Sequence, residues 1–120
     1  MSWSSDDDRV ELVARFTALP GHEEEVAGLL LGLTAKVREE PGCLAFEPYR
    51  VAAPPAGSGV EGGEAGPEPV GAGFVVVEAY RDEAAFAEHI AAPYGAEFNA
   101  ALGPLIAEDA SVLSFLAPLG

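Results

Sequence analysis

Apolar residues recur along this chain at two spacings, and the order in which those spacings follow one another restricts the fold more than any other feature. Val10, Leu12, Ala14 and Phe16 alternate with other side chains, which is the period of a strand. Residues 22–40 instead repeat apolar side chains every three or four positions, which is the period of a helix. The same criteria predict strands at 9–19, 43–51, 73–81 and 111–119, and helices at 22–40, 83–91 and 94–107.

This order predicts an α+β fold of the ferredoxin-like kind, β-α-β followed by β-α-α-β, with a four-stranded antiparallel sheet. Helices then cover one face of the sheet. In the third strand, Phe74 and Tyr80 point to one face and Val75 and Val77 to the other, so both faces are apolar. We therefore expect a second copy of the chain to cover the face that the helices leave open.

Two further details bear on packing. Gly28 and Gly32 lie inside the first predicted helix, where glycine lowers stability, so we expect them to permit close packing there. In the second helix, Phe86, His89 and Ile90 share one stripe, which we expect to face the sheet.

The length of 120 residues indicates a single domain spanning 1–120. Residues 1–8 are predicted to be a disordered polar leader. Residues 52–73 are rich in glycine and proline and contain no basic residue. They predict a long hairpin loop, an insertion that cannot bury enough apolar area to order itself. We expect residues 55–70 within it to be mobile and dispensable.

The loop contains GSGVEG, residues 57–62, which fits the dinucleotide fingerprint G-x-G-x-x-G. That motif binds a pyrophosphate only when a helix begins on it. Here Pro67 and Pro69 follow, and each removes a backbone donor that a helix requires. The sequence therefore predicts no nucleotide cofactor at this motif.

Charge and cysteine content restrict the partners. Twenty acidic residues against six basic ones give a formal net charge of −14, which disfavours nucleic acid and anionic membrane surfaces. No stretch has the length of a membrane span, and the acidic start lacks the pattern of a secretion signal. Cys43 is the single cysteine, which is consistent with a reducing compartment. We predict a cytoplasmic protein.

Several stretches together resemble one known family. They are ALPGHEEEVAGLLLGLTAKVREEPGCLAFEPYR, FVVVEAYRDEAAFAEHIAAP and LGPLIAEDASVLSFLAPL. They resemble the antibiotic biosynthesis monooxygenase family of dimeric α/β barrels over most of residues 9–118, and only the loop at 52–73 departs from it. The most specific pieces are the PGC turn and the block from Glu78 to His89.

The resemblance implies a homodimer with two sheets back to back and one pocket per subunit. Better understood members of the family oxidise electron-rich phenols or quinols with O2 and use no flavin, haem or metal. The sequence itself also predicts no metal site, because the candidate ligands are too few and too scattered. They are His22, His89 and Cys43. We therefore expect no cofactor, with a small aromatic molecule and O2 as substrates.

Such chemistry requires an apolar pocket, a base for the phenolic proton and a donor for the resulting anion. His89 is the candidate base, since an unperturbed imidazole pKa of about 6.5 suits proton removal near neutrality. Tyr80 is the candidate donor to the oxyanion. The remaining candidates would contact the substrate: Tyr94, Asn99, Phe98, Phe74, Glu78 and Arg15.

Each candidate also has a purely structural interpretation. His89 would brace a carboxylate such as Glu78, the tyrosines would pack with satisfied hydroxyls, and Asn99 would hold a backbone group. Arg15 would be a solvated or ion-paired side chain on a strand. The protein would then be a non-catalytic small-molecule binding or stress-associated protein with the same pocket, and an isomerase or decarboxylase on the same scaffold is a third hypothesis.

One branch of the family degrades haem through an asparagine, a tryptophan and a histidine. The corresponding positions here hold Ala14, His89 and Asn99, so none of the three residues matches. The sequence therefore predicts that this chain does not belong to the haem-degrading branch.

Overall fold

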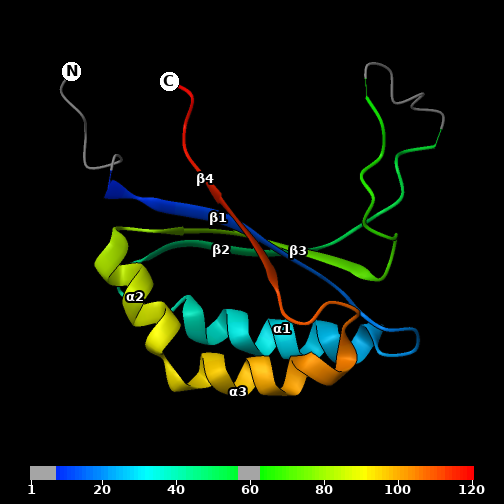
Figure 1. Cartoon of the computed structure of the whole chain (residues 1–120), viewed down its shortest axis with the longest axis horizontal. Helices are drawn as coiled ribbons and strands as arrows, with labels where there is room; N and C mark the ends of the chain where they lie inside the picture. Colours follow the sequence, from blue (N-terminus) through cyan, green and yellow to red (C-terminus); the bar gives the residue numbers. More distant parts are fainter. Residues whose placement is uncertain (1–7, 57–62) are drawn as a thin grey trace.

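The computed structural model describes residues 8–56 and 63–120, and its elements follow the predicted order (Figure 1). The elements are β1 (Val10–Thr17), α1 (Glu23–Val37), β2 (Cys43–Arg50), β3 (Gly73–Tyr80), α2 (Glu83–Ala91), α3 (Pro93–Leu102), the short 3-10 helix η2 (Gly103–Leu105) and β4 (Val112–Leu116). The fourth strand is shorter than predicted, and Gly103-Pro104 ends α3 by tightening its last turn into η2. The predicted α+β architecture is confirmed.

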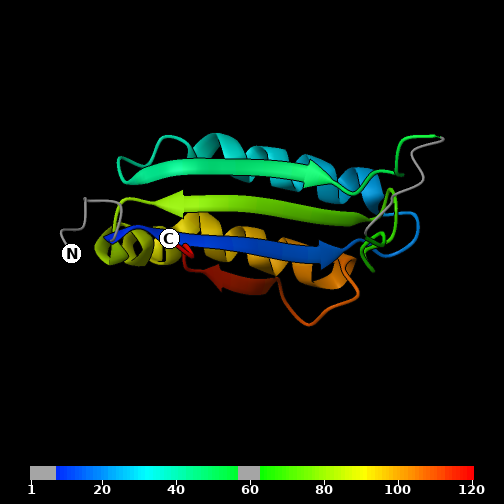
Figure 2. The same ribbon diagram turned by 90° about the horizontal axis from the view of Figure 1, so that it is seen from above.

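The four strands form one antiparallel sheet in the order β2-β3-β1-β4. All three α-helices lie against one face of this sheet, while none of the described residues forms a layer on the other face (Figures 1 and 2). Pro48 has no backbone donor, and it lies in β2, an edge strand, where the missing donor is tolerated. The molecule therefore has two layers, and any cavity between them is bounded by sheet on one side and helices on the other.

The core lies between the layers, where alternate strand residues meet the apolar stripe of α1. Leu12, Ala14 and Phe16 of β1 are buried, as are Val26 and Leu30 of α1. The helix begins with three consecutive acids, Glu23 to Glu25, at the end where the helix dipole favours negative charge. The inward-facing residues of the strand and the apolar stripe of the helix therefore pack together in one core, as the sequence predicted.

The second helix places its predicted apolar stripe between the two layers. Asp82 caps its N-terminus by accepting a hydrogen bond from the Ala85 backbone at 2.8 Å. Ala85 is the buried residue of this helix, and Ile90 is 60% exposed. Phe86, His89 and Ile90 nevertheless all line the space between the helices and the sheet, so the predicted stripe is confirmed, although Ile90 stays largely exposed.

The glycines of α1 also contradict the prediction of close packing. A Cβ atom built at Gly28 or Gly32 meets nothing within 4 Å. Gly42, in the turn before β2, is the crowded position, since a side chain there would overlap Ala85 of α2. The close approach is thus between this turn and α2.

We expect Gly28→Ala and Gly32→Ala each to raise the free energy of unfolding by about 0.5–1 kcal/mol, because alanine loses less backbone entropy in a helix. Gly42→Ala should lower it by about 1–3 kcal/mol through overpacking against Ala85. Urea denaturation of the three single variants measures these differences. A stabilised Gly42→Ala protein would contradict the packing described here.

The face of the sheet without helices keeps exposed apolar side chains. Val77 of β3 is 42% exposed and Tyr49 of β2 is 58% exposed, and Val112 and Leu116 of β4 are also exposed. By the strand register, these side chains share a face with Glu11 and Arg15 of β1. This outer face therefore combines an apolar surface with two oppositely charged residues of β1.

The C-terminal end of the predicted hairpin loop is bonded to the neighbouring strands. Gly71 donates to the Val51 carbonyl at 2.9 Å, Gly73 donates to the Pro69 carbonyl at 2.8 Å, and Ala18 donates to the Ala72 carbonyl at 2.9 Å. Glu68 forms an ion pair with Arg15 at 3.6 Å. These contacts join residues 68–73 to β1 and to the end of β2. The mobility of residues 55–70 stays a prediction, and the GSGVEG motif at 57–62 and leader residues 1–7 lie outside the described residues.

Candidate functional site

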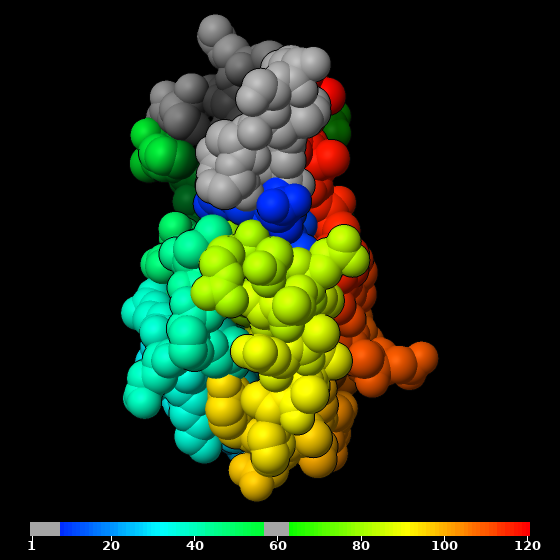
Figure 3. Space-filling model, turned by 90° about the vertical axis from the view of Figure 1, so that its left-hand side faces the viewer, coloured from blue at the N-terminus to red at the C-terminus, as the bar shows by residue number. Residues whose placement is uncertain are grey.

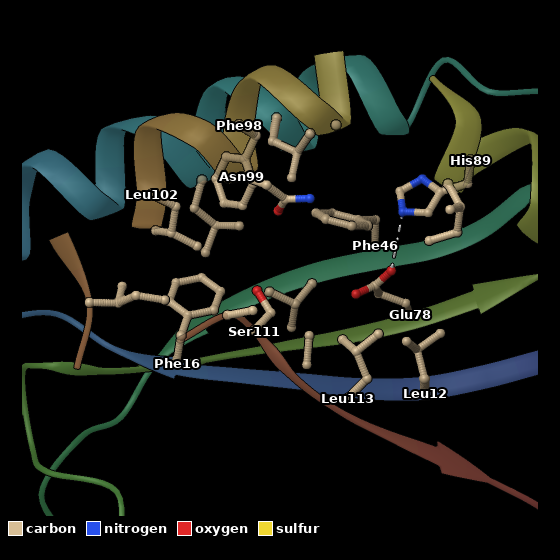
Figure 4. A pocket seen from close by; sticks show the side chains of 18 of the residues that line it. Leu12, Phe16, Phe46, Glu78, His89, Phe98, Asn99, Leu102, Ser111 and Leu113 are labelled. Carbon is tan, nitrogen blue, oxygen red and sulfur yellow. Dashed lines mark ion pairs between the residues drawn. The ribbon is translucent and has the colours of Figure 1, made fainter. Parts of the chain in front are cut away.

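A cavity of about 400 Å³ lies between the sheet and the helices (Figure 4). Most of its wall is apolar, because it is built from inward-facing strand residues and from the stripes of α1 and α3. These residues are Leu12, Ala14, Phe16, Leu30, Leu33, Phe46, Val76, Phe86, Ile90, Phe98, Leu102, Ile106 and Leu113. A site of this size and character suits a ring-shaped apolar ligand.

One end of the cavity carries a buried carboxylate. Glu78, on β3, is only 6% exposed and accepts a hydrogen bond from the Tyr80 hydroxyl at 2.6 Å. Burial raises the pKa of the Glu78 carboxyl above its usual range, and the Tyr80 hydrogen bond and nearby His89 partly oppose this. Burial, together with donation to Glu78, raises the pKa of the Tyr80 hydroxyl as well. Tyr80 therefore stays protonated and holds Glu78 in place.

His89, on α2, faces the same end of the cavity. Its Nε2 atom lies 3.8 Å from Glu78 Oε1, as the dashed line in Figure 4 shows. Its Nδ1 atom lies 3.2 Å from both carboxylate oxygens of Glu40. Its ring packs on Tyr80, with the ring centroids 4.7 Å apart. An ionised carboxylate only accepts, so Glu40 favours the tautomer with the proton on Nδ1, which leaves the Nε2 lone pair toward the cavity.

Glu40 lies in the turn after α1 and holds a second partner. The Tyr94 hydroxyl, on α3, donates a short hydrogen bond to Glu40 Oε2. Burial and this hydrogen bond raise the pKa of Tyr94 to about 12. The Glu40 backbone is itself fixed, since its amide donates to Val37 and its carbonyl accepts from Cys43. Glu40 thus joins the turn, α2 and α3 at one point.

The space-filling view toward α2 shows why these groups meet. At this end of the molecule α2 lies between β4 on one side and the turn after α1 on the other (Figure 3). The side chains of His89 and Glu40 are accordingly only 13% and 16% exposed. A partly buried polar network therefore lies at the end of the apolar cavity. It links, in this order, Tyr94, Glu40, His89, Glu78 and Tyr80.

A match to a family model shows the protein family of this chain. The family model described as "Antibiotic biosynthesis monooxygenase" matches residues 9–101, which is more than half of the chain. This chain belongs to the antibiotic biosynthesis monooxygenase family. None of the curated protein sequences matches it significantly.

Solved structures with the family's fold resemble this family member closely. Rv0793 from Mycobacterium tuberculosis is 26% identical, with a TM-score of 0.73, and the match covers 93% of this chain and 96% of that one. PA3566 from Pseudomonas aeruginosa is 24% identical, with a TM-score of 0.73 and coverages of 94% and 96%. A Caulobacter crescentus CB15 protein that carries the same family name is 25% identical, with a TM-score of 0.73 and coverages of 95% and 92%.

The structure of this family member brings four of the predicted site residues to the cavity wall, namely Glu78, His89, Phe98 and Asn99. Tyr80 and Phe74 lie behind that wall: Tyr80 holds Glu78, and Phe74 stacks on Phe16 with the ring centroids 5.9 Å apart. The positions compared with the haem-degrading branch, Ala14, His89 and Asn99, all line the same cavity.

Two predicted contacts lie elsewhere. Tyr94 lines a groove between α1 and α3 instead of the cavity, and it reaches the site only through Glu40. Arg15 points to the outer face of the sheet, where it bonds Ser114 at 3.2 Å and pairs with Glu68. Its neighbours Ala14 and Phe16 face the core, and successive strand side chains point to opposite faces, so Arg15 cannot reach the cavity.

Sequence reasoning missed two parts of this site. The first is Glu40, and one signal could have found it: an acid just beyond a helix C-terminus opposes the helix dipole. The second is the segment Asp109–Ser111, which lines the cavity from the β4 side. Glu108 holds this segment by accepting from the Thr17 amide at 2.7 Å and from its hydroxyl at 2.9 Å. No local pattern in the sequence predicts the contact between Glu108 and Thr17.

Within residues 8–56 and 63–120, no group of three or more histidine, cysteine, aspartate or glutamate side chains could hold a metal ion. His22 instead pairs with Glu25 at 3.1 Å on the exposed side of α1. Across the same residues, every helix is too short or too polar to cross a membrane.

Proposed function

We propose that this protein is a cofactor-independent monooxygenase that oxidises an aromatic polyketide, phenol or quinol with O2. One observation carries the proposal: an imidazole held through Nδ1 by Glu40 turns Nε2 toward an apolar cavity of about 400 Å³. Membership in the antibiotic biosynthesis monooxygenase family supports it. His89 and Glu78 are the assigned groups at the reacting end, and Phe98 and Asn99 contact the ring.

The first step is removal of the phenolic proton by His89 Nε2. The imidazolium that forms lies between the carboxylates of Glu40 and Glu78, and both favour its positive charge. The apolar wall excludes water, which strengthens these interactions. The phenolate that remains is electron-rich enough to react with O2 directly, so the protein's task is to bind, deprotonate and shield the ring.

The oxidation balances without a further reductant. The phenolate gives one electron to O2, and the resulting phenoxyl radical and superoxide combine to form a carbon–oxygen bond at the para carbon. The peroxide takes the proton back from His89. Loss of the para C–H proton then cleaves the O–O bond, so that one oxygen stays as a carbonyl and the other leaves as water. The ring loses two hydrogen atoms and gains one oxygen atom, and O2 is the only oxidant.

Oxygen consumption tests this proposal. Purified protein, treated with a chelator and supplied with no cofactor, should consume one O2 for each 1-naphthol, dihydroxynaphthalene or anthrone converted. Product analysis with ¹⁸O2 should place one labelled oxygen in the ring product. Absence of O2 consumption across the whole panel, with folded protein, would sink the proposal.

A non-catalytic binding protein is the second candidate, and one observation favours it. Glu40 already holds His89 and Tyr94, and Glu78 holds Tyr80, as the residues of a structural brace would. Such a protein would bind the same ring compounds without consuming O2. Ligand titration in parallel with the oxygen electrode distinguishes the two candidates.

We also propose that the protein is a homodimer in which the outer faces of two sheets pack together. The exposed apolar surface on the outer face supports this proposed dimer. In the described residues it includes Val77, Tyr49, Val112 and Leu116. The single cysteine and the net charge of −14 further favour a cytoplasmic protein that binds neither nucleic acid nor membranes.

Light scattering at micromolar concentration should give a mass of about 25 kDa, twice the 12.4 kDa of the chain. Val77→Lys should shift the mass toward the monomer, because it places a charge in the centre of the apolar face. Gly28→Ala, on α1, is the matched control and should leave the mass unchanged. A folded wild-type protein that elutes as a monomer would contradict the proposed dimer.

A further inference from the structure

The positive charges of this chain all lie away from the cavity. The chain has six basic residues, and all six fall within the described ranges, yet none lines the cavity. Four are paired elsewhere: Arg15 with Glu68, Arg38 with Glu47, Arg50 with Glu24 and Arg81 with Asp82. Lys36 lies over the Tyr94 ring on the side of the other groove, and Arg9 precedes β1.

The ionisable groups that do line the cavity are mostly acidic. They are Glu78 on β3, His89 on α2 and Asp109 in the segment before β4. His89 already faces Glu78 on one side and Glu40 on the other. An anionic group on a ligand would therefore meet carboxylates, and the single imidazole that could pair with it is engaged by two of them.

We propose that the cavity selects uncharged hydroxyaromatic rings and rejects rings that carry an ionised carboxylate, sulfate or phosphate. This deepens the proposed function, on which the hydroxyaromatic class rests. A carboxylate that enters an apolar cavity without a cation or sufficient donors loses its hydration and gains nothing in return. The net charge of −14 adds repulsion along the approach.

Asn99 is the position at which this selectivity is most directly changed. It lies on α3 and its amide points into the cavity between Phe98 and Phe46 (Figure 4). A lysine there would supply the cation that the wall lacks. Glu97 lies two residues away on the side of α3 that lines the other groove. Glu97→Gln changes the net charge by +1, as Asn99→Lys does, but leaves the cavity as it is.

The test uses a matched pair of ligands, 6-hydroxy-2-naphthamide and 6-hydroxy-2-naphthoate, which differ in charge and hardly in shape. Binding is measured anaerobically by calorimetric titration, and shifts of the His89 and Asn99 NMR signals report that each ligand occupies the cavity. We expect the amide to bind at least about 10-fold more tightly than the naphthoate to the wild type. Asn99→Lys should reduce that ratio at least about 10-fold, and Glu97→Gln should leave it within about 2-fold.

The outcomes separate this proposal from the proposed function. Equal binding of amide and naphthoate to the wild type would overturn the selectivity, whatever the oxygen electrode shows. Equal effects of Asn99→Lys and Glu97→Gln would overturn its assignment to the cavity wall. Failure of the amide to shift the His89 signal would overturn it too. Tight, selective binding of the amide without O2 consumption by any ring compound would sustain the selectivity and overturn only the monooxygenase proposal.

Discussion

His89→Ala is expected to lower the rate of O2-dependent oxidation by about 10²–10⁴-fold, the usual contribution of a general base. The reason is that no other group at the reacting end can take the phenolic proton and return it. The Glu78 carboxylate is already engaged, since it accepts the hydrogen bond of the Tyr80 hydroxyl at 2.6 Å and lies beside His89 Nε2. The measurement is initial O2 consumption per folded molecule.

The controls separate chemistry from folding. His22→Ala removes the other histidine, which pairs with Glu25 on the exposed side of α1, and it should leave the rate unchanged. His89→Ala should also cost about 1–3 kcal/mol of unfolding free energy, because Glu40 and Glu78 lose a shared partner. An unaltered rate in a destabilised protein would show that His89 is a brace and not a base.

Glu40→Gln is expected to lower the oxidation rate by about 10²-fold, although Glu40 does not line the cavity. Glu40 is a positioning residue: it holds Nδ1–H of His89 and the Tyr94 hydroxyl, and it acts on the substrate only through the imidazole. A glutamine keeps the shape but presents an amide that both donates and accepts, so it no longer selects one tautomer. The loss should appear mainly in kcat, with KM little changed.

NMR gives a readout that is independent of turnover. The chain contains two histidines, so a long-range ¹H–¹⁵N spectrum shows two imidazole patterns, and His22→Ala assigns them. We expect His89 in the wild type to be protonated on Nδ1 when neutral, and Glu40→Gln to change that pattern. Glu25→Gln is the matched control, since it alters the equivalent exposed pair with His22 and should leave the His89 signals and the rate unchanged. An unchanged His89 pattern in Glu40→Gln would contradict the positioning role.

Much of the fold follows from local patterns in the sequence. Alternation in residues 10–17 and 73–80 was enough to assign which side chains point into the core, and Phe16, Val76, Glu78 and Tyr80 are buried as the pattern requires. The same alternation already placed Arg15 opposite Phe16. Its assignment as a cavity residue conflicted with that pattern, and the structure resolves the conflict in favour of the strand period.

The site was only partly predictable, because its contacts join residues that no local pattern connects. The structural interpretation of His89 named Glu78 as one carboxylate that it would brace, and the structure places Nε2 3.8 Å from that carboxylate. The closer partner of its ring is Glu40, 49 positions earlier in the chain. Tyr94 was predicted to border the cavity, yet the turn of α3 that carries it faces α1 and the Glu40 turn.

The sequence by itself determined which residues lie on which face of each element, because the 2-residue and 3.6-residue periods are properties of the backbone. It did not determine that the cavity lacks cations, since Arg15 was predicted to contact the substrate and the structure turns it to the outer face. Only the tertiary structure decided which acid holds His89. The Gly42–Ala85 contact brings α2 against the turn after α1, and that approach places Glu40 within hydrogen-bond distance of Nδ1. Packing between distant segments sets that distance, and no periodicity in the sequence encodes it.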